Sequence, residues 1–230
     1  MERTALITGA SGNLGKAVVE NLLGLDFRVA VLSRRLGKMK AGLPGGNLAF
    51  EVDLTDESRV DSVIEEVYGQ FASVDIAVLT VGGFAMGKIA ETGLEEMNRM
   101  YSLNFVSAYN VARPLVARME KQERGGQLVF IGTRPGLEPE RGGSMIAYTL
   151  SKSLLFSLAR AINGGGGAHR VRASVVVPGT MDTPENRSAM PDADFSKWVS
   201  PQDVAENIMH LVSPAGSKLR KSILKVYGDA

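Results

Sequence analysis

Tyr148 and Lys152 lie four residues apart in the segment YTLSK, and their types suit acid–base chemistry. Four residues make about one helical turn, so both side chains would project from the same face. An ammonium held near a phenol favours the phenolate and lowers the pKa of the phenol from about 10 toward working pH. Such a phenol can donate a proton to a carbonyl oxygen or accept one from an alcohol. The same spacing also occurs on ordinary amphipathic helices, so the pair needs support from the rest of the chain.

A glycine-rich turn near the start of the chain gives that support. TGASGNLG lies between an expected strand and an expected helix. There Gly9 permits a tight turn, Gly12 lets the backbone approach a pyrophosphate, and Gly15 allows helix and strand to pack closely. The N-terminus of the helix offers free N–H groups and a positive dipole end to phosphate oxygens. We therefore expect a dinucleotide site that includes Gly9, Ser11, Gly12, Asn13, Leu14 and Gly15.

The end of the second expected strand bears on which dinucleotide is bound. An acidic residue about 20 residues after the glycine turn would favour NAD. The segment VAVLSRR places Ser33, Arg34 and Arg35 there instead. A guanidinium can pair bidentately with a 2′-phosphate, although two solvated arginines at a strand end are the alternative. We expect NADP(H) to be preferred, with NAD(H) possible. Asp53, followed by Leu54, ends the third strand and either accepts from the adenine amino group or simply begins a helix.

Short apolar runs alternate with longer amphipathic stretches along the chain. The runs predicted to be strands begin at Thr4, Phe27, Leu48, Asp75, Gln127, Val171 and Ser222. Most are continuously apolar, as buried parallel strands are. Helices are expected near 13–24, 56–72, 93–119, 147–163 and 201–212, with Thr55 and Ser200 as candidate N-caps and Gly164 to Gly167 ending the fourth. This alternation predicts an α/β fold: a Rossmann-type, doubly wound parallel sheet of about seven strands with helices on both faces.

Composition narrows the class of protein. With 230 residues, 44% of them hydrophobic, we expect one soluble globular domain spanning 1–230. The net charge of +1 gives no field for nucleic acid or an anionic membrane. The chain has no cysteine, and His169 and His210 are too far apart to suggest a metal site, so both are interpreted as surface or cap residues. The first strand is expected at Arg3, which leaves no room for a signal peptide and favours the cytoplasm.

With the glycine turn upstream and YTLSK downstream, the chain resembles the short-chain dehydrogenase/reductase superfamily over nearly its full length. The resemblance implies that Tyr148 is the acid–base residue, and that Lys152 tunes it while holding the nicotinamide ribose. It also implies a proton relay through Asn104, in the segment LNF of the long central helix. A serine usually orients the carbonyl; here Thr133 in IGT takes its place, and Ser144 is a rival.

The resemblance extends the cofactor site beyond the glycine turn. Pro178 and Gly179 match the Pro-Gly segment after the sixth strand, and Thr183 matches the threonine that contacts the nicotinamide amide. The usual Asn-Ala-Gly after the fourth strand is replaced here by TVGG, and Asn13 stands where many members have glycine. The further cofactor residues implied are Val81, Gly82, Gly83, Lys152, Pro178, Gly179, Thr180, Met181 and Thr183.

Three segments resemble the dihydropteridine reductase branch: VGGFAMG, MIAYTLSK and DTPENRSAMPDADFSKW. Members of that branch have an acidic residue after the second strand and lack the serine hydroxyl, whereas this chain has Arg34 and Thr133 at these two places. We expect an NAD(P)H-dependent oxidoreductase that reduces a carbonyl or a quinonoid dihydropterin-like substrate, with Tyr148 as proton donor. The alternative is an NADP-sensing regulatory protein with little turnover, which would have no need of Tyr148, Lys152 and Asn104 together.

The segment 184–198 is polar and contains Pro191, which predicts a loop that closes over the substrate. Candidate apolar walls of the substrate site are Phe84, Met190, Phe195 and Trp198. For Trp198, packing of the loop onto the body of the protein is an equal alternative.

The central helix is apolar over a face wider than one buried stripe needs, at Met97, Met100, Tyr101, Phe105, Ala108, Ala112 and Val116. The helix near 147–163 carries Leu154, Leu155, Phe156 and Leu158. Two such helices per subunit could pair across a two-fold axis, so we expect a homodimer or homotetramer.

Overall fold

The computed structural model describes residues 3–165, 170–220 and 222–229, and across them runs one seven-stranded sheet in the order β3-β2-β1-β4-β5-β6-β7. Every neighbouring pair of strands is parallel. The strands are β1 (Arg3–Thr8), β2 (Phe27–Ser33), β3 (Leu48–Glu51), β4 (Ile76–Leu79), β5 (Gly126–Ile131), β6 (Val171–Pro178) and β7 (Ile223–Val226). The predicted α/β fold with a doubly wound parallel sheet is confirmed.

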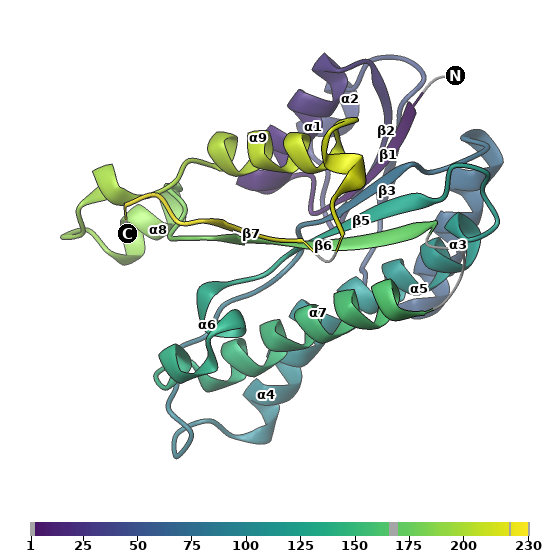
Figure 1. Cartoon of the computed structure of the whole chain (residues 1–230). Coiled ribbons are helices and arrows are strands. Elements are labelled where there is room, and N and C mark those ends of the chain that lie inside the picture. Colours follow the sequence, from purple (N-terminus) through teal and green to yellow (C-terminus); the bar gives the residue numbers. More distant parts are fainter. Residues whose placement is uncertain (1–2, 166–169, 221, 230) are drawn as a thin grey trace.

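Helices cover both faces of this sheet (Figure 1). On one face lie α1 (Asn13–Gly24) and α9 (Pro201–Val212); on the other lie α3 (Glu57–Gln70), α5 (Ser107–Met119) and α7 (Ile146–Gly164). Alternate strand residues face opposite ways, so Ala5 and Ile7 pack with α1 and α9, whereas Leu6 packs with the other three helices. Both faces of each central strand are therefore apolar, which is why the strands are continuous hydrophobic runs.

The long central helix predicted over 93–119 is three segments. It begins as α4 (Leu94–Tyr101), passes through a π-helical turn at Ser102–Val106, and continues as α5. A π-helical turn widens the helix locally and often marks a functional position. Asn104 lies in the middle of this turn and is wholly buried.

The prediction that 184–198 is a loop is wrong for its first part. Residues Pro184–Ala189 form a helix, α8, and Phe195–Lys197 form a 3₁₀ turn. Thr183 caps α8 by accepting a hydrogen bond from the Asn186 N–H, and proline occupies the first helical position. A hydroxyl residue before proline also begins α9 at Ser200, where it is predicted and confirmed with a full capping box.

Other short helices were not predicted from the sequence. They are α2 (Lys38–Gly42), α6 (Arg134–Leu137) and 3₁₀ turns at Pro139–Gly142 and Gly216–Lys218. The prediction of Thr55 as an N-cap is also wrong: Asp56 caps α3 by accepting from the Arg59 N–H, because the Thr55 hydroxyl donates to Asp53 instead. Helix α7 does end at Gly164, while His169 and residues 166–167 lie outside the described residues. His210 is exposed in the last turn of α9.

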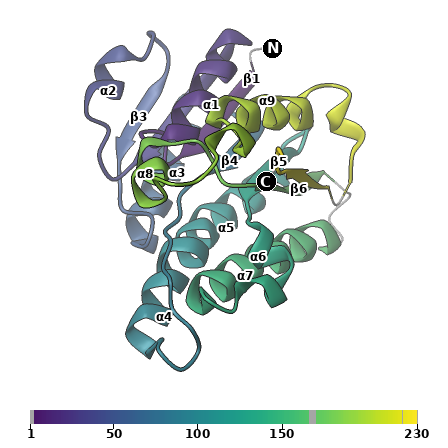
Figure 2. The same cartoon turned by 90° about the vertical axis from the view of Figure 1, so that its left-hand side faces the viewer.

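Parallel strands bring the predicted site residues to one edge of the sheet. The glycine turn follows β1, Gly82 and Gly83 follow β4, and Thr133 follows β5. Short helices α4, α6 and α8 lie at this end of the molecule, on the left in Figure 1 and facing the viewer in Figure 2. Ligands of doubly wound sheets bind at the carboxyl ends of the strands, so this edge is the place to look for a site. Among the helices described, none is long and apolar enough to span a bilayer.

Candidate active site

The glycine turn has the geometry that its sequence predicts. Gly9 adopts φ +65°, a left-handed conformation that favours glycine. A Cβ at Gly15 would lie 2.2 Å from the Gly9 carbonyl oxygen, so only glycine lets α1 start this close to the turn. Gly12 is the N-cap of α1 and has no side chain to satisfy the first N–H groups of the helix. The positive end of α1 is therefore open to an anionic group, as a pyrophosphate requires.

A cleft of about 660 Å³ runs along this edge of the sheet. Eleven of the predicted cofactor residues line it: Gly9, Ser11, Gly12, Ser33, Arg34, Arg35, Asp53, Leu54, Val81, Gly82 and Gly83. Five further lining residues are Val52, Thr55, Thr80, Leu103 and Ser107, which were not predicted as site residues. Thr80 ends the strand before the two glycines, and its hydroxyl donates to the Thr8 carbonyl at 2.7 Å. Its position directly after β4 is the one signal that could have placed it here.

The three predicted cofactor residues that follow Gly12, namely Asn13, Leu14 and Gly15, do not line the cleft. Leu14 packs in the core with α9, and the Asn13 amide donates to Glu185 of α8 at 2.8 Å. The start of α1 is thus joined to a segment 172 residues away.

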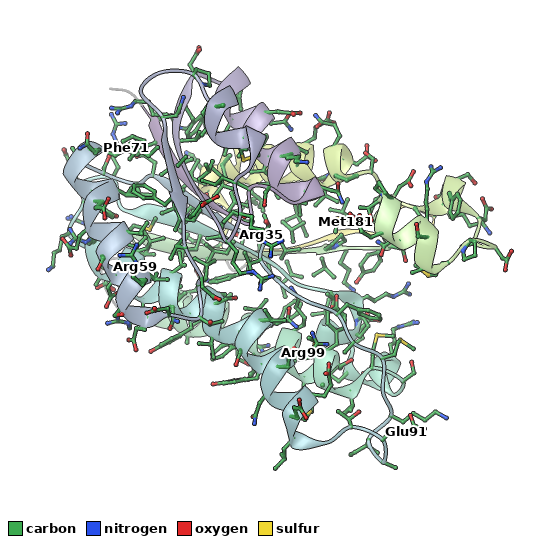
Figure 3. The ribbon with its side chains drawn as sticks, turned by 180° about the vertical axis from the view of Figure 1, so that it is seen from behind. Arg35, Arg59, Phe71, Glu91, Arg99 and Met181 are labelled. Carbon is green, nitrogen blue, oxygen red and sulfur yellow. The ribbon has the colours of Figure 1, made fainter. Side chains whose placement is uncertain are left out.

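The far end of the cleft carries the two arginines. Ser33 is buried and its hydroxyl lies 2.6 Å from that of Ser11, while Arg34 and Arg35 are exposed. Figure 3 shows Arg35 near the middle of this side of the molecule. Asp53 lies in the same cleft; hydrogen bonds from Thr55 lower the pKa of its carboxyl, and the charge of Arg34 acts in the same direction. One carboxylate therefore faces two guanidinium groups, which leaves this end positively charged.

Asn104 fixes the main chain after β4. Its Oδ1 accepts from the Gly83 N–H at 2.8 Å, its Nδ2 donates to the Gly83 carbonyl at 3.1 Å, and Nδ2 also lies 3.0 Å from the Ser151 hydroxyl. A Cβ at Gly82 would lie 2.7 Å from Asn104 Oδ1 and 2.9 Å from Lys152 Nζ. Asn104, Lys152 and the Gly82 backbone therefore meet at one point, which only glycine permits.

Tyr148 and Lys152 occupy successive turns of α7, as predicted, but in different surroundings. Lys152 is buried and its Nζ donates to the Ile131 carbonyl at 3.0 Å. Burial lowers the pKa of Lys152 to about 8. Tyr148 is half-buried, and the Phe84 ring lies edge-on to it at 5.0 Å between centroids.

The expected acidification of the phenol by Lys152 is not found. Burial raises the pKa of Tyr148 to about 12, and only a hydrogen bond with Thr133 acts to lower it. The physical reason is geometric: the Lys152 ammonium is directed at the Ile131 carbonyl and the Gly82 backbone. Tyr148 is consequently protonated at neutral pH, which suits a proton donor.

Thr133 and Ser144, the rivals for the hydroxyl role, lie in different environments. Thr133 caps α6 by accepting from the Gly136 N–H at 3.1 Å, and its side chain is hydrogen-bonded to Tyr148. Ser144 is exposed, and its carbonyl accepts from the Gly87 N–H at 2.8 Å. The structure therefore brings Thr133, and not Ser144, to the phenol.

The predicted residues after β6 lie beside the cleft rather than along it. Gly179 packs against the Tyr227 backbone, Met181 pairs with Val199, and the Thr180 carbonyl accepts from the Val199 N–H. The Met181 side chain lies on the α8 side of Arg35 in Figure 3. None of Pro178, Gly179, Thr180, Met181 and Thr183 lines the cleft.

The predicted apolar walls differ in exposure. Phe84 is 56% exposed and Met190 is 41% exposed, both on the outside of the site region. Phe195 and Trp198 are half-buried and pack on each other, with ring centroids 4.7 Å apart. The Arg187 guanidinium covers the Phe195 ring at 4.6 Å and pairs with Asp182. Contacts inside the segment 182–198 thus account for Phe195 and Trp198 without a substrate.

Curated relatives match along nearly the whole chain. The chain is 27% identical to carbonyl reductase family member 4 of Xenopus tropicalis over 219 residues, covering 92% of each protein. It is 28% identical to dihydropteridine reductase of Dictyostelium discoideum over 229 residues, covering 95% of this chain and 91% of the relative.

A solved structure and a family model agree with the fold. The structure described as ElxO with NADP bound superposes with a TM-score of 0.89 at 23% identity, covering 99% of this chain and 98% of that one, which shows the shared fold. The model of the short chain dehydrogenase family matches residues 3–194. The chain therefore belongs to the short-chain dehydrogenase/reductase family and is an NAD(P)-dependent oxidoreductase.

Proposed function

We propose that this enzyme is an NADPH-dependent reductase of a carbonyl or quinonoid dihydropterin-like substrate. The observation that carries the proposal is the place of Tyr148: its phenol is hydrogen-bonded to Thr133 and lies beside the exposed ring of Phe84. A protonated phenol next to a hydroxyl suits proton delivery to a carbonyl oxygen or an imine-like nitrogen.

The chain's own residues fit a dinucleotide. The open N-terminus of α1, the side-chain-free Gly12 and the cleft along Gly82 and Gly83 leave room for a backbone-bound cofactor. A Cβ at Gly82 would fill the space that Asn104 and Lys152 border. When bound, the nicotinamide supplies hydride to the substrate carbon.

Each catalytic side chain then has one task. Tyr148 donates its phenolic proton to the substrate as the carbon accepts hydride, and Thr133 holds the acceptor oxygen by a hydrogen bond. Lys152 donates to the Ile131 carbonyl beside Gly82, where its ammonium would hold the nicotinamide ribose. Asn104 positions the Gly83 backbone and connects to the main chain of Tyr148 through Ser151, whose hydroxyl donates to the Tyr148 carbonyl at 2.9 Å. Proton transfer of this kind contributes about 10²–10⁴-fold to a rate.

Preference for NADPH is proposed from the two arginines of the cleft. Arg34 and Arg35 follow β2 where the adenosine ribose of a dinucleotide binds, and a 2′-phosphate can pair with a guanidinium. Replacing Arg34 with Asp should raise the KM for NADPH by more than about tenfold and change that for NADH far less. Equal losses for both cofactors would argue against a phosphate contact.

The substrate class is tested by direct assay. Purified protein is mixed with NADPH or NADH and with a dicarbonyl, a quinone or a quinonoid dihydropterin, and cofactor oxidation is followed by absorbance. We expect NADPH oxidation with at least one of these substrates. Turnover of the pterin above the others would favour the dihydropteridine branch, which the Dictyostelium discoideum relative supports. Failure of all three substrates would count against the proposed reductase class.

We also propose that the enzyme is a cytoplasmic homodimer or homotetramer. The pairing surface is narrower than the sequence suggests, because Leu155, Phe156 and Met100 are buried within the subunit. Tyr101, Phe105 and Tyr109 instead form a column of stacked or tilted rings, with Tyr101 and Tyr109 more than 40% exposed. Light scattering that shows a monomer at micromolar concentration would contradict this assembly.

A further inference from the structure

A second pocket, of about 300 Å³, lies at the opposite edge of the sheet. It is lined where strands begin: Arg3 opens β1, Ile76 opens β4 and Gly126 opens β5, with Arg172 at the second position of β6. Because all strands are parallel, this edge is the one farthest from the cofactor cleft and from Thr133. The pocket therefore has no part in the proposed reduction.

The charges around this pocket are unbalanced. Arg3, Arg124 and Arg172 line it with a single carboxylate, Asp75, which already accepts from the Thr4 N–H and hydroxyl. None of the three guanidinium groups forms an ion pair with any residue that the structure describes. Surface arginines elsewhere do form such pairs, among them Arg99, Arg113, Arg118, Arg141 and Arg187.

Two of these arginines are held in place rather than left to move in solvent. Arg3 donates to the Val212 carbonyl at 2.8 Å and stacks over the Phe27 ring at 4.2 Å. Arg172 reaches the Gln127 side chain at 3.4 Å, and its Nε is buried without a hydrogen-bond partner within the described part of the chain. Burial lowers the pKa of both Arg3 and Arg172; the charge of Asp75 opposes this at Arg3, while Arg124 reinforces it there and Arg220 reinforces it at Arg172. A negative group in the pocket would satisfy the unused donor and offset the positive charges.

The floor of the pocket is backbone that cannot carry side chains. Gly125 adopts φ +65°, and a Cβ there would overlap the Arg170 carbonyl. A Cβ at Gly126 would lie 2.3 Å from the Met119 sulfur. Both glycines are therefore required by the close packing of this turn against Arg170 and Met119.

We propose that this pocket is a binding site for a phosphate group, held by the guanidinium groups of Arg3, Arg124 and Arg172. Guanidinium forks match the oxygens of a phosphate and remain charged at any physiological pH. The phosphate comes either as the free ion or as the end of a small phosphomonoester, which the pocket volume also admits. No residue that lines this pocket also lines the cofactor cleft, so the phosphate site is separate from the site of the proposed reduction.

Isothermal titration calorimetry at low ionic strength tests this site. Inorganic phosphate and glycerol 3-phosphate are each titrated into the wild-type protein and into Arg172→Gln and Arg124→Gln. Binding should weaken by about tenfold or more in both variants, since each removes one charged contact. The Arg124 side chain is exposed, so its variant keeps the test valid should Arg172→Gln unfold. A tighter fit of the ester would identify a phosphorylated metabolite, and equal or tighter binding of the ion would identify free phosphate.

Two matched control variants show whether phosphate binds in this pocket or elsewhere on the protein. Arg118→Gln removes the same charge from a surface arginine paired with Glu65, and Arg34→Gln removes it from the cofactor cleft. Arg118→Gln should bind phosphate as the wild type does, and Arg34→Gln should keep the phosphate binding that Arg172→Gln and Arg124→Gln lose. The proposal is overturned if no phosphate binds the wild type, if Arg118→Gln weakens binding equally, or if only Arg34→Gln loses it.

Discussion

The cluster around Asn104 and Lys152 and the segment from Met181 to Val199 lie at the same end of the molecule (Figure 1) but are held in different ways. Asn104 and Lys152 are buried and bond to main-chain groups of other elements. The segment is mostly exposed, and its polar and ring contacts are largely internal, as between Asp182 and Arg187 or Phe195 and Trp198. The cluster is therefore fixed by the core, whereas the segment is stabilised mainly by its own contacts and can adjust more easily.

Removing the phenolic hydroxyl should have the largest effect. Tyr148→Phe keeps the ring and its edge contact with Phe84 but has no proton to donate. We expect kcat to fall by about 10²–10⁴-fold. Steady-state kinetics with NADPH measure this, and cofactor affinity by fluorescence titration is the control. A kcat within a few-fold of the wild-type value would mean that Tyr148 is not the proton donor.

Lys152→Met should reveal how much burial of the Lys152 ammonium lowers the free energy of unfolding. Lys152 loses its proton near pH 8 in the folded protein, against 10.5 for the ordinary group. Between these values the unfolded chain binds more protons, so the stability of the wild type should rise with pH relative to the variant. The rise should be about 3 kcal/mol across this window.

Urea unfolding of cofactor-free protein at pH 7, 9 and about 10.5 measures that difference. Parallel pH profiles for the wild type and Lys152→Met would show that Lys152 is not the group that burial perturbs.

Two substitutions at Thr133 test the role of its hydroxyl beside the Tyr148 phenol. Thr133→Ser keeps both the cap of α6 and the hydrogen bond to Tyr148, whereas Thr133→Val loses both. We expect the serine variant to retain most activity and the valine variant to lose about tenfold or more in kcat. Ser144→Ala is the matched control. A larger loss in Ser144→Ala than in Thr133→Val would reverse the assignment.

The smallest effect is expected where the segment from Met181 to Val199 contacts the start of α1. Asn13→Ala breaks the contact between the start of α1 and Glu185 of α8. Amide exchange in α8 should become about two- to fivefold faster, as befits one exposed polar contact. Hydrogen–deuterium exchange measures this, with α7 as the internal reference. Unchanged exchange in α8 would show that other contacts hold the segment in place.

The sequence predicts the strands, the long helices and the glycine turn because these depend on local pattern and on backbone sterics. Gly9 and Gly15, for instance, are dictated by φ and by contact distance. Features that depend on tertiary packing could not be predicted from the sequence. The direction of the Tyr148 pKa depends on where the Lys152 ammonium points and on burial, neither of which spacing along a helix reveals. Thr183 followed by Pro184 is a sequence signal for the start of helix α8. The polar composition of the segment instead led to the prediction of a loop.

The π-helical turn at Ser102–Val106 holds one residue more than an α-helical turn would. The helix segments on either side therefore keep the phase of a continuous α-helix that is one residue shorter. Deleting one residue in this stretch should leave Met100 and α5 facing the core as they do now, but it should remove the wide turn from which Asn104 reaches the Gly83 backbone. Such a deletion should consequently lower activity far more than it lowers the free energy of unfolding.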